Sequence, residues 1–173
     1  MSTITVKELA APTGFDLKIA AGETLDLKSQ GTVTMPAGAV LQVVHGMSET
    51  QVSTTSNSGF TSTGITATIT PSSTSSKIWI MSKFTGRAGT ATDLLSAIYR
   101  GTVSGTNLTG NASTKYNNQS SEPSDLVNTH LDSPNTTSAT TYTVGFKSSV
   151  NGQTSIANDA STEGTITLME VAG

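Results

Sequence analysis

Few residues in this sequence have side chains that could carry out acid–base, nucleophilic or metal chemistry. There are two histidines, His45 and His130, and no cysteine. His130 and Asp132 would share one face of a strand and could supply two metal ligands, but a metal site needs further ligands that the sequence does not display. Because Asp132 directly precedes Ser133-Pro134, its simpler role is to cap a turn. No nucleophile occupies a strained elbow, so we expect no enzyme activity, no cofactor and no bound metal.

The composition disfavours several other function classes. The chain has 173 residues, a net charge of −3 and only 12% charged residues, so nothing attracts a polyanion and nucleic-acid binding is not expected. The opening MSTITVKELA has no basic region followed by an apolar run, and so does not resemble a secretory signal. No apolar run approaches the ~20 residues of a membrane span. We therefore expect neither secretion by a signal peptide nor membrane insertion.

The stretch 14–46 repeats every eight residues. A glycine or its neighbour opens each octad, and two apolar residues follow at the fourth and sixth positions, where they would share one face of a short strand. The fourth positions are Leu17, Leu25, Val33 and Leu41, and the sixth are Ile19, Leu27, Met35 and Val43. Four such strands in one chain cannot bury their apolar face, because repeat architectures need stacked neighbours. We interpret 14–46 as a stalk that joins three chains; the alternative is an ordinary sheet with an accidental period.

Two further features bear on this oligomer. His45 ends the fourth octad, where three copies could bring it to a common axis around an anion or metal, although an exposed histidine is the simpler interpretation. Residues 1–13 contain Ile4, Val6 and Leu9 before Pro12, which would stop any helix. A free tail of this length frays unless something holds it, so we expect 1–13 to dock on a partner surface.

The remainder, 47–173, has the pattern of an all-β head. Apolar and polar residues alternate around 65–69, 142–146 and 166–168, and Asn151-Gly152 is typical of a hairpin turn between two strands. In 77–84 both faces are apolar: Ile78, Ile80 and Phe84 share one, Trp79 and Met81 the other. Such a strand is central or covered by another subunit. About eight strands without a credible helix predict an antiparallel jelly roll or sandwich.

Residues 101–125 are polar and irregular, and we expect a surface excursion in which Tyr116 is the candidate receptor contact. Trp79 could also stack on a sugar ring, but with Met81 two residues away it is better placed in a core or in the trimer interface.

Four stretches carry a resemblance to a known group of proteins. In chain order they are 35–44, 70–78, 131–142 and 165–171, and together with the opening MSTITV they make up about a quarter of the sequence and are spread along its length. The chain resembles small virion proteins of tailed bacteriophages. The resemblance implies a homotrimer on the phage particle, made in the bacterial cytoplasm, whose jelly-roll head is similar to the tumour-necrosis-factor fold.

Two functions follow from this resemblance. As a capsid decoration (cement) protein, the trimer would dock on the major capsid protein through 1–13 and stabilise the shell. As a tail-fibre tip, it would attach to tail proteins and bind a host surface glycan through loops near 101–125. The small self-contained chain and the lack of an identifiable tail-attachment domain favour decoration.

Overall fold

The computed structural model describes residue 21 and residues 35–111, 113–117 and 122–173. Residues from Met35 to Gly173 belong to one compact unit, which we call the head. The predicted docking-arm residues Ile4, Val6 and Leu9 lie outside the described residues, as do the octad residues Leu17, Ile19, Leu25, Leu27 and Val33.

The described part of the head consists of antiparallel strands and one short 3-10 turn. The alternating pattern predicted a strand-only head, and this is confirmed. In chain order the elements are β1 (Val40–Ser48), β2 (Val52–Thr54), β3 (Thr61–Ile69), β4 (Lys77–Ala88), β5 (Thr92–Arg100), β6 (Thr106–Asn107), β7 (Ser113–Asn117), β8 (Ser124–Asp132), β9 (Thr140–Ser148), β10 (Ser155–Ala157), η1 (Asp159–Ser161) and β11 (Gly164–Val171).

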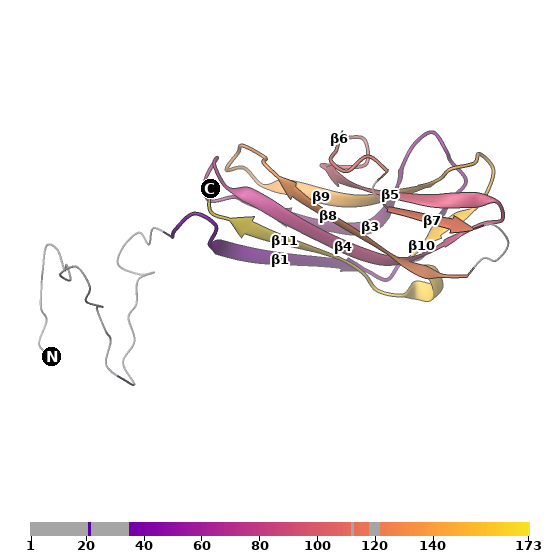
Figure 1. The fold of residues 1–173 in the computed structure, drawn as a ribbon, viewed down its shortest axis with the longest axis horizontal. Helices are drawn as coiled ribbons and strands as arrows, with labels where there is room; N and C mark the ends of the chain where they lie inside the picture. Colours follow the sequence, from indigo (N-terminus) through magenta and orange to yellow (C-terminus); the bar gives the residue numbers. More distant parts are fainter. Residues whose placement is uncertain (1–20, 22–34, 112, 118–121) are drawn as a thin grey trace, which may run out of the picture. The chain divides into compact units, whose positions relative to one another are not determined.

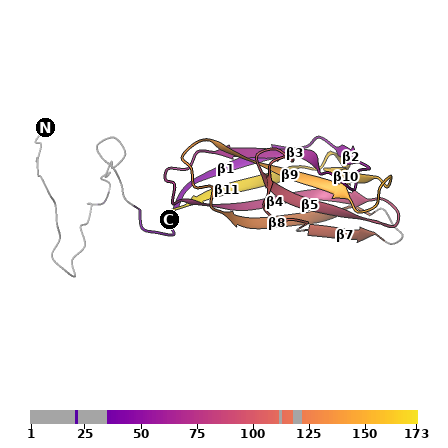
Figure 2. The same ribbon diagram turned by 90° about the horizontal axis from the view of Figure 1, so that it is seen from above.

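These strands form the two sheets of a sandwich (Figures 1 and 2). In sheet A the strands lie in the order β1-β11-β4-β8, with β10 and β2 continuing the sheet beside the C-terminal part of β4. In sheet B the order is β3-β9-β5-β6, and β7 also pairs with β5. Strand β4 is therefore central in sheet A, which is one of the two placements that its apolar faces predicted.

The core lies between the sheets and is built by period-two alternation. On β4 the inward residues Ile78, Ile80 and Phe84 are fully buried. They meet residues of the same alternation on β11 and on sheet B, among them Ile65, Leu94, Ile98, Tyr142, Val144, Phe146, Ile166 and Leu168. Inward residues of two facing sheets interdigitate in this way in antiparallel sandwiches.

One glycine lets the two sheets approach each other at the β1 edge. A Cβ atom on Gly46 would overlap the carbonyl oxygen of Thr66 on β3. Nearby, the Gln42 amide donates to the Thr70 carbonyl oxygen at 2.8 Å. Strand β1 thus closes this edge of the sandwich, and no larger residue than glycine fits at position 46 without a shift.

The chain enters and leaves the head at one end of the sandwich, which we call the entry end (Figure 1). The Gly38 amide donates to the Ala172 carbonyl oxygen at 2.8 Å, and the Ala172 amide donates to Ala39 at 2.9 Å. The boundary predicted between residues 46 and 47 falls inside β1, because the fourth octad pairs with β11. Leu41 and Val43 consequently belong to the head.

Two local predictions were wrong. Asn151-Gly152 does form a turn, and Gly152 has a positive φ of 80°, but the turn does not join a hairpin. Strand β9 belongs to sheet B and β10 to sheet A, so the turn carries the chain between sheets. The excursion 101–125 is also less irregular than predicted, since it contains β6, β7 and the start of β8.

Candidate oligomerisation face

The outward side of sheet A carries apolar side chains from four strands, with threonines, a histidine and a lysine among them. We call the outward side chains of β1, β11, β4 and β8 the sheet A face. The strand register places them in three successive rows across the sheet. In strand order the rows are Val43, Met169, Trp79 and Leu131; then His45, Thr167, Met81 and Thr129; then Met47, Thr165, Lys83 and Val127.

The exposed apolar side chains of the head are concentrated on this face. Among the described residues nine large hydrophobic side chains are exposed, and six of the nine belong to the three rows: Val43, Met47, Trp79, Met81, Val127 and Leu131. Four strands at ~4.8 Å spacing and three rows at ~6.6 Å give the whole face, polar residues included, an extent of about 19 Å by 20 Å. Contiguous apolar patches of a few hundred Å2 are often functional and mark interaction sites.

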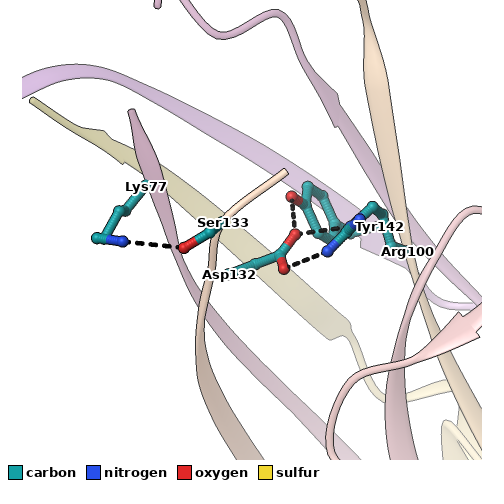
Figure 3. Close-up of polar contacts among 5 residues, drawn as sticks. All are labelled: Lys77, Arg100, Asp132, Ser133 and Tyr142. Carbon is teal, nitrogen blue, oxygen red and sulfur yellow. Dashed lines mark hydrogen bonds and ion pairs between the residues drawn. The ribbon is translucent and has the colours of Figure 1, made fainter. Parts of the chain in front are cut away.

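The charges on this face are few and largely paired. The Lys83 ammonium lies 2.9 Å from the Asp125 carboxylate, which also accepts a hydrogen bond from the Thr85 hydroxyl at 2.8 Å. At the entry end the Lys77 ammonium donates to the Ser133 hydroxyl at 2.9 Å (Figure 3). A second surface can therefore cover the apolar rows without burying an unpaired carboxylate.

Behind the face, a buried ion pair links the two sheets near the entry end. Asp132 ends β8 of sheet A, while Arg100 and Tyr142 are register partners on β5 and β9 of sheet B. The Arg100 guanidinium donates to both Asp132 oxygens, at 2.8 and 2.6 Å, and the Tyr142 hydroxyl donates at 2.7 Å (Figure 3). A bidentate arginine–carboxylate pair fixes geometry as well as charge.

These contacts decide the ionisation of Asp132. Burial disfavours its charged form, but the hydrogen bonds from Arg100 and then Tyr142 outweigh burial and hold the pKa of Asp132 below its usual value. Burial and the hydrogen bond to Asp132 raise the pKa of Tyr142. Asp132 is therefore committed to a structural ion pair.

A second buried carboxylate fixes the β3–β4 loop to strand β11 of sheet A. Glu170 on β11 is fully buried and accepts from the Gln42 amide at 2.6 Å, the Ser72 backbone amide at 2.7 Å and the Ser72 hydroxyl at 2.6 Å. Burial opposes its charge, yet these donors hold the pKa of Glu170 below the ordinary value. The loop is thereby tied to one of the four strands that carry the apolar rows.

The residues predicted for the interface are only partly brought together. Val43, Trp79 and Met81 lie on the sheet A face, whereas Leu41 is half-buried at an irregularity of β1, and exposed Met35 precedes that strand. Tyr116 lies in β7, where its backbone pairs with Asp93. The direction of its side chain is outside what the structure describes, so its predicted receptor role stays a prediction.

Several face residues were not singled out from the sequence. Met47, Val127, Leu131 and Met169 complete the rows. Their signal was present in the alternation, because a residue next to an inward side chain on a strand must point outward. What the sequence lacked was the strand order that brings β8 and β1 to either side of β4 and β11.

Two absences hold for the described residues. They contain no group of three or more His, Asp or Glu side chains arranged to hold a metal ion. Nor does this part of the chain contain a helix of the length and apolarity needed to cross a membrane.

Comparison with known proteins gives structural likenesses alone. No protein-family model and no curated protein matches the chain. Among solved structures it is similar to a chain in the structure of infectious bursal disease virus, Gt strain, with 15% identity and a TM-score of 0.45. The match covers 95% of this chain and 47% of that one, so the chain spans about half the length of this relative. A likeness at that level assigns no function.

Proposed function

We propose that this chain is a structural protein of a bacteriophage particle and that it works as a homotrimer on the capsid as a decoration protein. The observation that carries the proposal is the sheet A face, an apolar surface of a polar β-sandwich. Together with the octad repeats, it gives the chain two separate reasons to associate with copies of itself.

The occupant of the sheet A face is a second copy of the chain. The predicted octads need neighbouring chains to bury their apolar positions, and in chain order they lead directly into β1. Strand β1 contributes Val43 and Met47 to the face. In chains joined by the octads, the first strand of each head would therefore be β1, which carries part of the apolar rows. The Lys83 charge on the face is neutralised by Asp125, which limits like-charge repulsion between copies.

A decoration protein would act by thermodynamic linkage, because it binds the assembled shell and not its separate subunits. A trimer that bridges several subunits of the major capsid protein adds contacts that exist only in the assembled shell, so the shell is stabilised against expansion. Residues 1–13, with Ile4, Val6 and Leu9, would supply the docking arm. The chemistry required of the head is association, which the apolar rows provide.

A tail-fibre tip that binds a host glycan is the second candidate. It would use the end of the head away from the entry end, where a hollow of about 210 Å3 is lined by Arg87, Ala88, Gly89, Thr154 and Ile156. The Arg87 guanidinium there is held by Asp159 at 2.9 Å. In a fibre tip, weak glycan contacts at this end would be multiplied by three copies.

Copy number per particle separates the two functions. Purified particles would be analysed by quantitative mass spectrometry against their major capsid protein. Decoration predicts hundreds of copies per particle, whereas a fibre tip predicts a handful in multiples of three or six. Absence of the chain from purified particles would contradict both.

A further inference from the structure

His45 is the titratable imidazole within the apolar rows of the sheet A face. It is exposed and points outward from β1 between Val43 and Met47. Its Nδ1 atom lies 3.1 Å from the Thr167 hydroxyl on β11, and Met81 on β4 continues the same row. A copy of the chain that covers these rows would cover the imidazole as well.

Little on this face would compensate a positive charge on the imidazole. The outward residues of β11 are neutral: Thr165, Thr167 and Met169. The charged outward groups of β4 nearest in register are cationic, and the Lys83 ammonium already holds the carboxylate of Asp125 on β8.

The remaining nearby carboxylates face elsewhere or lie beyond the strand. Glu170 points into the sandwich, where Gln42 and Ser72 hold it. Glu49 follows the end of β1, and Glu163 directly precedes β11. None of the ion pairs found among the described residues includes His45.

We propose that His45 makes self-association through the sheet A face sensitive to mild acid, so that the assembled trimer is held by neutral histidine and weakened when the imidazole gains a proton. This inference rests on the self-association proposed above. A neutral imidazole with a hydroxyl partner can be covered by apolar side chains, whereas a charged one loses its water without gaining a counter-charge.

The size of the effect follows from proton linkage. Histidine side chains of ordinary basicity gain their proton near pH 6.5, while carboxylates do so near pH 4. If only the neutral form is assembled, each subunit takes up one proton on dissociation, so the association constant falls by at most about tenfold per subunit for each pH unit, or about a thousandfold for three subunits. The window between pH 7 and pH 5.5 therefore isolates histidine from the acidic residues.

The test is sedimentation equilibrium of the full chain at pH 7.0 and 5.5, with two matched variants. His45→Gln keeps a group that can bond to Thr167 but cannot take up a proton. His130→Gln removes the other histidine of the chain, which is half-buried on β8. The expected result is a large rise in the trimer dissociation constant at pH 5.5 for the wild type and His130→Gln, and less than about a threefold change for His45→Gln.

The outcomes separate this inference from the function on which it rests. A wild-type oligomer with the same dissociation constant at both pH values overturns the switch and leaves self-association standing. A His45→Gln variant that retains the wild-type response to pH also overturns it. A chain that is monomeric at pH 7.0 at all accessible concentrations overturns both. Thermal unfolding of each variant at both pH values checks that the head remains folded.

Discussion

Replacement of Trp79 by alanine should weaken association by an amount that can be estimated from its exposure. Trp79 is 39% exposed in the single chain and lies between Met169 and Leu131 in the first apolar row. Because a tryptophan can bury up to about 250 Å2, about 100 Å2 of it remains to be covered by another copy. Replacement by alanine removes about 80 Å2 of this area, which at about 25 cal/mol per Å2 is worth about 2 kcal/mol per subunit.

This loss should be visible even if the octads also hold the chains together. Contributions from distant sites add, so the trimer would lose about 6 kcal/mol in total, or about 30-fold in affinity per subunit. Sedimentation equilibrium over a dilution series measures it. Thr66→Ala is the matched control, because Thr66 is exposed on β3 of the other sheet. If Trp79→Ala and Thr66→Ala had the same dissociation constant as the wild type, the apolar rows would not be the interface.

Three further changes test separate parts of the molecule. Leu25→Asp, in the second octad, should give monomer or aggregate in sedimentation velocity, because three charges would be forced into an apolar core; an unchanged trimer would refute the octad interpretation. Asp132→Asn should lower the free energy of unfolding at pH 7 by about 3 kcal/mol in urea titrations, since it leaves Arg100 without its buried partner, whereas Asp125→Asn in the exposed pair should cost less than about 1 kcal/mol. Folding lowers the pKa of Asp132. The ionised carboxylate therefore stabilises the fold at pH values above its unfolded pKa near 4, and this stabilisation is lost as the pH falls through the folded pKa. If wild type and Asp132→Asn lost stability identically with falling pH, this reasoning would be contradicted. Gly46→Ala should destabilise the head by about 2 kcal/mol, because the added Cβ overlaps the Thr66 carbonyl. Gly59→Ala is the control and should be neutral, because the space around Gly59 is open. Equal urea midpoints for the two variants would refute the close approach of β1 to β3.

The sequence was informative where a local period has one structural meaning. The residues 77–84 predicted a strand with two apolar faces, and β4 is central in sheet A with Ile78 and Ile80 inward and Trp79 and Met81 outward. This success has a simple cause, because successive side chains of a strand must point to opposite sides.

The sequence was uninformative about features that depend on which strands are neighbours in a sheet. Asn151-Gly152 has the chemistry of a hairpin turn, yet turn chemistry does not determine whether the next strand joins the same sheet, and β10 joins the other one. The pairing of Asp132 with Arg100 spans 32 residues and has no local signature. Strand β7, Ser113–Asn117, lacks an apolar alternation, so it was assigned to the polar excursion.

The most direct test of the sheet A face is methionine oxidation by dilute hydrogen peroxide, followed residue by residue with peptide mass spectrometry. Met47 and Met81 are 58% and 45% exposed in the single chain, so both should oxidise readily when the protein is dilute and dissociated. At concentrations that favour the assembled form, both should become markedly slower to oxidise, and Trp79→Ala should restore their reactivity. Oxidation of Met47 and Met81 at equal rates in concentrated and dilute protein would show that no second copy covers this face.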